Sequence, residues 1–261
     1  MAAIENTPAL MLKVKGAAIA ALCACAMPGV AGGVEIVQPK GVLELFTSQG
    51  CSSCPPADAV LAKLAEAGDT LALAWHVDYW DYIGWKDTFA SPDNTKRQRA
   101  YAVSLGASNI YTPQAIINGH MDVVGSRGKD VKEALEKLAG TPGGLTVPID
   151  ASVSGKVLHV EIPANAHSAG TTLWMVYFRG HAQVEVKRGE LAGQTLDYTN
   201  VVTNVEMIGM VGDKPLVAEF PLKDMAQRGY ESCALVLQKV TDHGTPGPIV
   251  GAAMVSDFAS Q

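Results

Sequence analysis

The sequence predicts an α/β domain followed by a second domain of antiparallel β-structure, and two observations lead to this fold class. In the first half, short apolar runs alternate with helical patterns, and two cysteines separated by two residues lie between the first run and the first helix. After Gly143 and Gly144, the helical patterns give way to roughly eight short β-rich runs separated by Gly, Pro and Asn. This change predicts one domain at 38–142 and an antiparallel sandwich at 145–261.

Residues 1–31 have the pattern of a secretory signal peptide, because Lys13 and Lys15 precede an apolar run that ends in small residues. The run is shorter than the roughly 20 residues that a membrane span needs. We therefore expect a mature protein without membrane attachment, located in the periplasm or secreted. A lipoprotein anchored at Cys25 is the alternative.

Composition favours a folded protein with no affinity for nucleic acid. Apolar residues make up 48% of the chain, which is enough for a sizeable core. Residues 1–31 hold two lysines and one glutamate, so the mature chain keeps 18 basic and 25 acidic residues and a net charge of −7. No basic cluster is present, so binding to nucleic acid or to an anionic membrane is not expected.

The first domain is predicted to have four short strands and three helices. A buried strand at 42–46 leads to a helix at 57–67, which Gly68 ends, and a second strand begins at Thr70. The remaining elements are a helix from 94 to 105, a strand at 115–117, an Asn118-Gly119 hairpin turn, a return strand at 121–124 and a helix at 129–138.

The second domain is predicted to contain only short strands and one helical turn near 223–227. Its predicted strands are 146–154, 156–162, 171–179, 183–187, 198–211, 216–220, 233–240 and 251–258.

The segment from Gly50 to Pro55, Gly-Cys-Ser-Ser-Cys-Pro, is typical of a dithiol redox site at a helix N-terminus. The positive end of the helix dipole favours a thiolate on Cys51, which we expect to be exposed and to act as the nucleophile. Cys54, one turn inward, is expected to resolve the mixed disulfide. An inert disulfide that holds the helix start is the alternative. A four-cysteine zinc site is excluded because the mature chain has only one further cysteine, Cys233.

Thr112 and Pro113 come just before the third strand, and an X-Pro step is the common place for a cis peptide bond. A Cys-x-x-Cys helix start combined with such a step resembles thioredoxin-like proteins, and the small number of elements is closer to a glutaredoxin-like core. The resemblance implies that Pro113 is cis and faces the dithiol, and that the Thr112 backbone binds extended peptides.

Longer motifs resemble domain-of-unknown-function family 1223, exported thioredoxin-like proteins of proteobacteria. The matching segments are 44–58, 75–87, 111–114, 118–119, 198–202 and 247–251. The resemblance implies a thioredoxin-like fold and a β-rich C-terminal part, but it supplies no substrate.

Aromatic residues are concentrated after the second predicted strand. Parallel strands end at the same edge of a sheet, so these residues should lie near Cys51 and form one wall of a substrate groove. The proposed wall consists of Tyr79, Trp80, Tyr82 and Trp85.

Other polar residues receive weaker assignments. Asp78 and Asp81 are candidates for proton transfer at Cys54, whereas His76 and Cys233 are expected to be buried core residues. The histidines show no metal-ligand spacing, so no metal site is predicted.

These observations favour an exported thiol-disulfide oxidoreductase that needs no cofactor beyond its cysteines and exchanges with protein or small-molecule thiols and disulfides. One alternative is a Cu(I)-handling protein that uses both thiolates and a third ligand such as His76 or a methionine. The other is a non-catalytic binding module with a structural disulfide.

Overall fold

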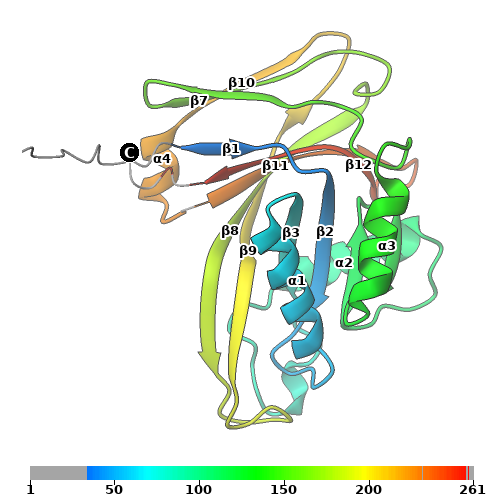
Figure 1. Cartoon of the computed structure of the whole chain (residues 1–261), viewed down its shortest axis with the longest axis vertical. Helices are drawn as coiled ribbons and strands as arrows, with labels where there is room; N and C mark the ends of the chain where they lie inside the picture. The colour runs from blue at the N-terminus through cyan, green and yellow to red at the C-terminus, as the bar shows by residue number, and fades with distance from the viewer. Residues whose placement is uncertain (1–33, 231, 257, 259–261) are drawn as a thin grey trace, which may run out of the picture. The chain divides into compact units, whose positions relative to one another are not determined.

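A large sheet runs through the part of the chain that the computed structural model describes, residues 34–230, 232–256 and 258 (Figure 1). Its strand order is β1-β12-β11-β8-β9-β3-β2-β4-β5. These strands are β1 (Glu35–Val37), β2 (Gly41–Thr47), β3 (Thr70–His76), β4 (Gln114–Ile117), β5 (Met121–Val124), β8 (Thr171–Glu185), β9 (Thr195–Met210), β11 (Ser232–Val240) and β12 (Pro246–Ser256).

A second, smaller sheet has the order β10-β7-β6. It contains β6 (Asp150–Ser154), β7 (Val157–Ile162) and β10 (Leu216–Pro221). The helices are α1 (Pro55–Ala67), α2 (Pro92–Ser104), α3 (Gly128–Leu138), α4 (Leu222–Gln227) and the short 3-10 helix η1 (Asp81–Ile83).

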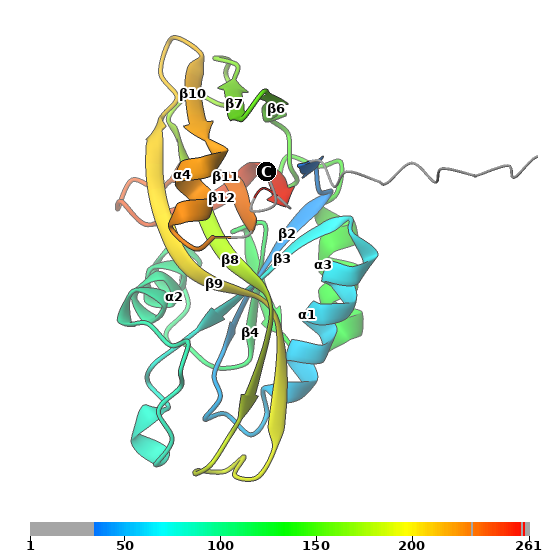
Figure 2. The same ribbon diagram turned by 90° about the vertical axis from the view of Figure 1, so that its left-hand side faces the viewer.

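Strands β2 and β3 are parallel neighbours, and every residue in both is buried. Complete burial is expected where helices cover both faces of a sheet. Helices α1 and α3 cover one face through Leu61 and Val131, and α2 covers the other through Tyr101 (Figure 2). Strand β4 runs antiparallel to β2, and β5 runs antiparallel to β4. The C-terminal ends of β2 and β3 therefore lie side by side at one edge.

Short-range sequence signals are confirmed in this half. Helix α1 begins at Pro55 and is closed by Gly68, whose φ of 77° suits glycine. Asn118 and Gly119 have φ angles of 49° and 61° and connect β4 to β5, as an Asn-Gly hairpin turn requires.

The large sheet continues into the second half of the chain through β9. Strands β3 and β9 pair in parallel at Ala74 and Val201. Asn200 has a φ of 51°, and its side-chain N–H donates to the carbonyl oxygen of Ala72 at 2.9 Å. Strand β9 pairs with β8, β8 with β11, and β11 with β12. These strands extend the first half's sheet instead of forming a separate one, which sequence periodicity alone did not predict.

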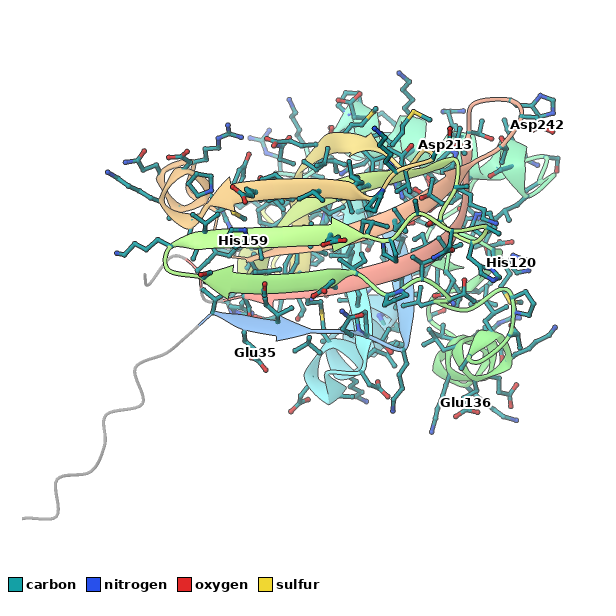
Figure 3. The ribbon with its side chains drawn as sticks, turned by 90° about the horizontal axis from the view of Figure 1, so that it is seen from above. Glu35, His120, Glu136, His159, Asp213 and Asp242 are labelled. Carbon is teal, nitrogen blue, oxygen red and sulfur yellow. A yellow bond between two sulfur atoms is a disulfide. The ribbon has the colours of Figure 1, made fainter. Side chains whose placement is uncertain are left out.

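The smaller sheet packs against one face of β8, β11 and β12. Leu158 and Val160 of β7 share a buried core with Met175 and Leu235. Figure 3 shows β7, marked by His159, layered over the reddish strands of the large sheet. Two antiparallel layers are therefore stacked, as in a sandwich, but the layer formed by β8, β11 and β12 is part of the large sheet. The predicted strands at 171–179 and 183–187 are a single strand, β8.

The predicted signal peptide and the lipoprotein alternative at Cys25 lie outside the described residues. Within the described residues, no helix is long and apolar enough to cross a membrane.

Candidate functional site

The two cysteines of the Cys-Ser-Ser-Cys segment form a disulfide at the start of α1. Their Cα atoms are 5.4 Å apart, and Cys54 immediately precedes the helix. The N–H of Cys51 donates to the carbonyl oxygen of Ser48, and the N–H of Cys54 donates to the carbonyl oxygen of Cys51, each at 3.1 Å. The connection between β2 and α1 therefore consists of two consecutive tight turns. The Oγ atom of Ser53 lies 3.4 Å from Cys51 Sγ.

The disulfide is buried, which corrects the expectation that Cys51 is exposed. Both cysteines have 0% accessible surface, whereas Ser52 between them is exposed. The segment after β3 packs closely on this turn: a Cβ atom at Gly50 would lie 2.9 Å from Trp80 Cβ. A side chain at position 50 would displace Trp80, so this glycine permits the close packing.

Thr112 and Pro113 lie beside the start of α1, and the peptide bond between them is cis. Trp80 donates a hydrogen bond from Nε1 to Thr112 Oγ1 at 2.7 Å. The carbonyl oxygen of Pro113 accepts from the N–H of Gly125 at 2.9 Å, and Gly125 packs against Ala57 in the first turn of α1. Trp80 thus connects the turn before the disulfide to the Thr-Pro step.

The other proposed groove residues differ in their placement. Trp85 donates from Nε1 to Gln49 Oε1 at 2.9 Å, so it also packs beside the turn. The Tyr79 ring is partly buried, 6.3 Å from that of Trp80. Tyr82 is 81% exposed and extends into solvent. The structure therefore places Trp80 and Trp85 at the turn and Tyr79 next to Trp80, whereas Tyr82 is exposed to solvent.

A buried carboxyl group, Asp58, follows Cys54 by one helical turn. The backbone N–H of Asp58 donates to the carbonyl oxygen of Cys54 at 3.1 Å. Side chains in a helix lean towards its N-terminus, so the Asp58 carboxyl leans towards Cys54. Thr47, the last residue of β2, donates from Oγ1 to Asp58 Oδ1 at 2.8 Å. The sequence indicates that Asp58 faces inward, because Cys54, Asp58 and Leu61 share one helical face, but Asp58 was not among the predicted site residues.

Burial raises the pKa of Asp58 from 3.8 to about 7. Desolvation is the largest cause, and the nearby Asp87 adds to it. His76 and the hydrogen bond from Thr47 act in the opposite direction. Asp58 is therefore a carboxyl group that can give or take a proton near neutral pH.

A buried histidine–aspartate pair lies next to Asp58. His76 Nδ1 and Asp87 Oδ2 are 2.8 Å apart, and both side chains are inaccessible. Asp87 Oδ2 also accepts the backbone N–H of Gln49 at 2.8 Å. Tyr198 of β9 packs edge-on against the His76 ring, with centroids 4.6 Å apart. This pair fixes the turn before Cys51 and connects it to β9.

The two sequence candidates for proton transfer, Asp78 and Asp81, are both hydrogen-bonded to residues that follow β3. Asp78 accepts a hydrogen bond from Thr95 Oγ1 at 2.6 Å, and Asp81 accepts one from the backbone N–H of Asp87 at 3.0 Å. Both carboxylates thus organise the loop after β3, and Asp58 is a buried carboxyl one helical turn after Cys54.

The remaining candidates are placed as follows. His76 is buried, as expected, with one ring nitrogen paired to Asp87. Cys233 is buried in β11, and desolvation raises the pKa of its thiol. Across residues 34–230, 232–256 and 258, no group of three or more His, Cys, Asp or Glu side chains is arranged to hold a metal ion.

Residues 42–238 match the profile of a family described as "Protein of unknown function (DUF1223)". The chain belongs to the DUF1223 family. This DUF1223 protein is similar to the crystal structure of protein AGR_C_4864 from Agrobacterium tumefaciens, with 37% sequence identity and a TM-score of 0.74. The similarity covers 84% of the DUF1223 chain and 95% of the Agrobacterium chain. No functionally curated protein matches the DUF1223 chain. The family resemblance drawn from the sequence is confirmed.

Proposed function

We propose that this protein is an exported thiol-disulfide oxidoreductase whose redox centre is the Cys51–Cys54 pair. The observation that carries the proposal is the buried Asp58, whose pKa of about 7 suits proton exchange with Cys54. A structural disulfide needs no ionisable group buried near its inner sulfur. Burying such a group lowers stability, so its presence favours a functional role.

The exchange proceeds in two reversible steps. A thiolate of the partner attacks Cys51 Sγ, a bond forms between these two sulfurs, the Cys51–Cys54 bond breaks, and Cys54 leaves as a thiolate that takes the proton of Asp58. A second partner thiolate then attacks the partner's own sulfur in the mixed disulfide and releases Cys51 as a thiolate. The protein gains two electrons and the partner becomes a disulfide. In reverse, ionised Asp58 accepts the proton of Cys54 as Cys54 attacks the mixed disulfide.

The position of Cys51 before a helix supports its role as the attacked sulfur. The N-terminus of α1 stabilises negative charge on the reduced thiol. Because Cys51 has no accessible surface, a partner reaches it only when the packing around the turn opens. We assign this opening to Trp80, which packs against Gly50.

The local architecture supports a thioredoxin-like, glutaredoxin-like assignment of the first half. The order β3-β2-β4-β5, the helix that starts directly after the second cysteine and the Thr112-Pro113 step before β4 agree with that arrangement. On this assignment, the partners are protein or small-molecule thiols and disulfides in the periplasm or outside the cell.

A binding module with a structural disulfide is the second candidate, and the zero exposure of both cysteines favours it. Cu(I) handling is a weaker candidate, because the side chain of His76 is fully buried and, within the described residues, no group of three or more His, Cys, Asp or Glu side chains is arranged to hold a metal ion.

Trapping of mixed disulfides tests the proposal. The Cys54→Ser variant keeps the attacking thiol and lacks the resolving one, so it should accumulate covalent adducts when reduced protein meets an oxidised protein such as insulin. The Cys51→Ser variant is the matched control and should form far fewer adducts. Equal adduct formation by both variants, or none by either, rejects the oxidoreductase and leaves the structural disulfide.

A further inference from the structure

A cavity of about 770 Å³ lies between α2, β8 and β9, and neither the disulfide chemistry nor the family assignment accounts for it. Two of its lining residues, Trp75 and Val202, share a core with Tyr101 of α2, so it lies on the face of the large sheet that α2 covers. Its size is within the range of sites for small organic ligands, roughly 300–1,000 Å³.

Positive charge in the cavity is concentrated on Arg179. The other arginine in the lining, Arg97, is neutralised by Glu44 through two hydrogen bonds of 2.9 and 3.1 Å. Arg179 has no carboxylate partner among the described residues, and its guanidinium lies 5.8 Å above the centroid of the Phe89 ring. The arginine is therefore available to pair with an anion.

The acidic residue in the lining does not cancel this charge. Asp93 lies in the first turn of α2, where the helix N-terminus already stabilises its carboxylate. Asp93 is exposed, and so is Arg179, so water solvates both charges. Arg179 and the N-terminal end of α2 thus favour an anionic group in the cavity.

Aromatic side chains supply the apolar part of the cavity. Trp75, Phe89 and Trp174 all line it, from three different segments. Trp75 is 2% exposed, and its indole N–H is buried without a hydrogen-bond partner in the described part of the chain. The indole nitrogen has almost no accessible surface, so the ring of Trp75, and not its N–H, contributes to the cavity lining.

We propose that this cavity binds a small carboxylate attached to a flat apolar group. The carboxylate pairs with Arg179, since guanidinium groups bind carboxylates through two parallel hydrogen bonds. The apolar group packs against Trp174 and Phe89. This site is separate from the exchange chemistry of the cysteines, so it stands or falls independently of the redox proposal.

Fluorine NMR with 4-fluorophenylacetate and its neutral amide, 4-fluorophenylacetamide, tests the site on the purified oxidised protein. The acid should bind with a Kd of about 1 mM or tighter, and the amide should bind at least about ten-fold more weakly, because charge-assisted hydrogen bonds contribute about 1.5–3 kcal/mol, or ten-fold to a hundred-fold in affinity.

Three variants make the test specific. Arg179→Gln should weaken binding of the acid about ten-fold or more and leave the amide unchanged, and Arg179→Lys should retain only part of the affinity, because it keeps the charge but cannot form the two parallel hydrogen bonds. Arg188→Gln is the matched control, since Arg188 is exposed and lies outside the cavity lining. Equal binding of acid and amide, an unchanged Kd in Arg179→Gln, an equal loss in Arg188→Gln, or no binding of either probe at 10 mM overturns the proposal.

Discussion

Replacing Asp58 with Asn is expected to stabilise the protein above pH 7 and to have little effect near pH 4. Asp58 is 8% exposed, and burial raises the pKa of its carboxyl from 3.8 to about 7. The folded protein therefore holds the neutral carboxyl, while the unfolded chain releases its proton near pH 4. One pKa unit corresponds to about 1.4 kcal/mol, so this shift lowers the free energy of unfolding by roughly 4 kcal/mol above pH 7.

The direction of the pH dependence follows from the raised pKa. Between about pH 4 and pH 7 the unfolded state has lost the Asp58 proton and the folded state still binds it, so stability falls as pH rises. Asparagine does not titrate, and its side-chain oxygen can still accept the hydrogen bond from Thr47. The stability difference between variant and wild type should therefore grow by about 1.4 kcal/mol per pH unit in this window and then level off.

Guanidinium unfolding of the oxidised proteins from pH 4 to pH 8, followed by tryptophan fluorescence, measures this difference. Asp69→Asn is the matched control, because Asp69 is half exposed and pairs only with the exposed Lys40. Its effect should be small and nearly independent of pH. A stability difference for Asp58→Asn that stays constant from pH 4 to pH 8 would refute the conclusion that Asp58 is buried in its neutral form.

Three further predictions concern the surroundings of the site. Glu44→Gln should destabilise the fold by about 3–5 kcal/mol in denaturant unfolding, because it leaves the buried charge of Arg97 uncompensated; a loss under about 1 kcal/mol would contradict this. Trp80→Phe removes the hydrogen bond to Thr112, worth about 1 kcal/mol, and should speed disulfide reduction by dithiothreitol roughly five-fold; an unchanged rate would mean that Trp80 does not restrict access. In the native reduced protein, Cys233 should not react with Ellman's reagent until the chain unfolds, and rapid labelling would contradict its burial.

Local sequence signals predicted the elements around the disulfide. Pro55 and Gly68 mark the two ends of α1, and the Asn118-Gly119 dipeptide marks the hairpin, because backbone sterics favour these residues at such positions. The cis bond before Pro113 was likewise expected from the resemblance to thioredoxin-like proteins.

Long-range packing was not predictable from these signals. The parallel pairing of Ala74 with Val201 joins segments far apart in the chain, and strand periodicity carries no information about which strand is the neighbour. Cys51 is buried and Trp80 packs over Gly50, and a local sequence pattern encodes neither feature. The cavity beside Arg179 is lined by residues of α2, β8 and β9, which are far apart in the chain.

The role of Asp58 is an intermediate case. Its spacing from Cys54 and Leu61 places it on the inner face of α1, which the sequence shows. Its raised pKa depends on desolvation and on Asp87, which only the three-dimensional arrangement reveals.

The reduction potential of the Cys51–Cys54 disulfide is the most direct test of its exchange function. Equilibration of the protein with glutathione buffers of known ratio, followed by acid quenching and thiol alkylation, yields the fraction reduced at each potential. A redox-active pair should show a midpoint between about −270 and −120 mV, the range of known dithiol oxidoreductases. A disulfide that stays oxidised below about −300 mV would be structural, and the oxidoreductase proposal would be wrong.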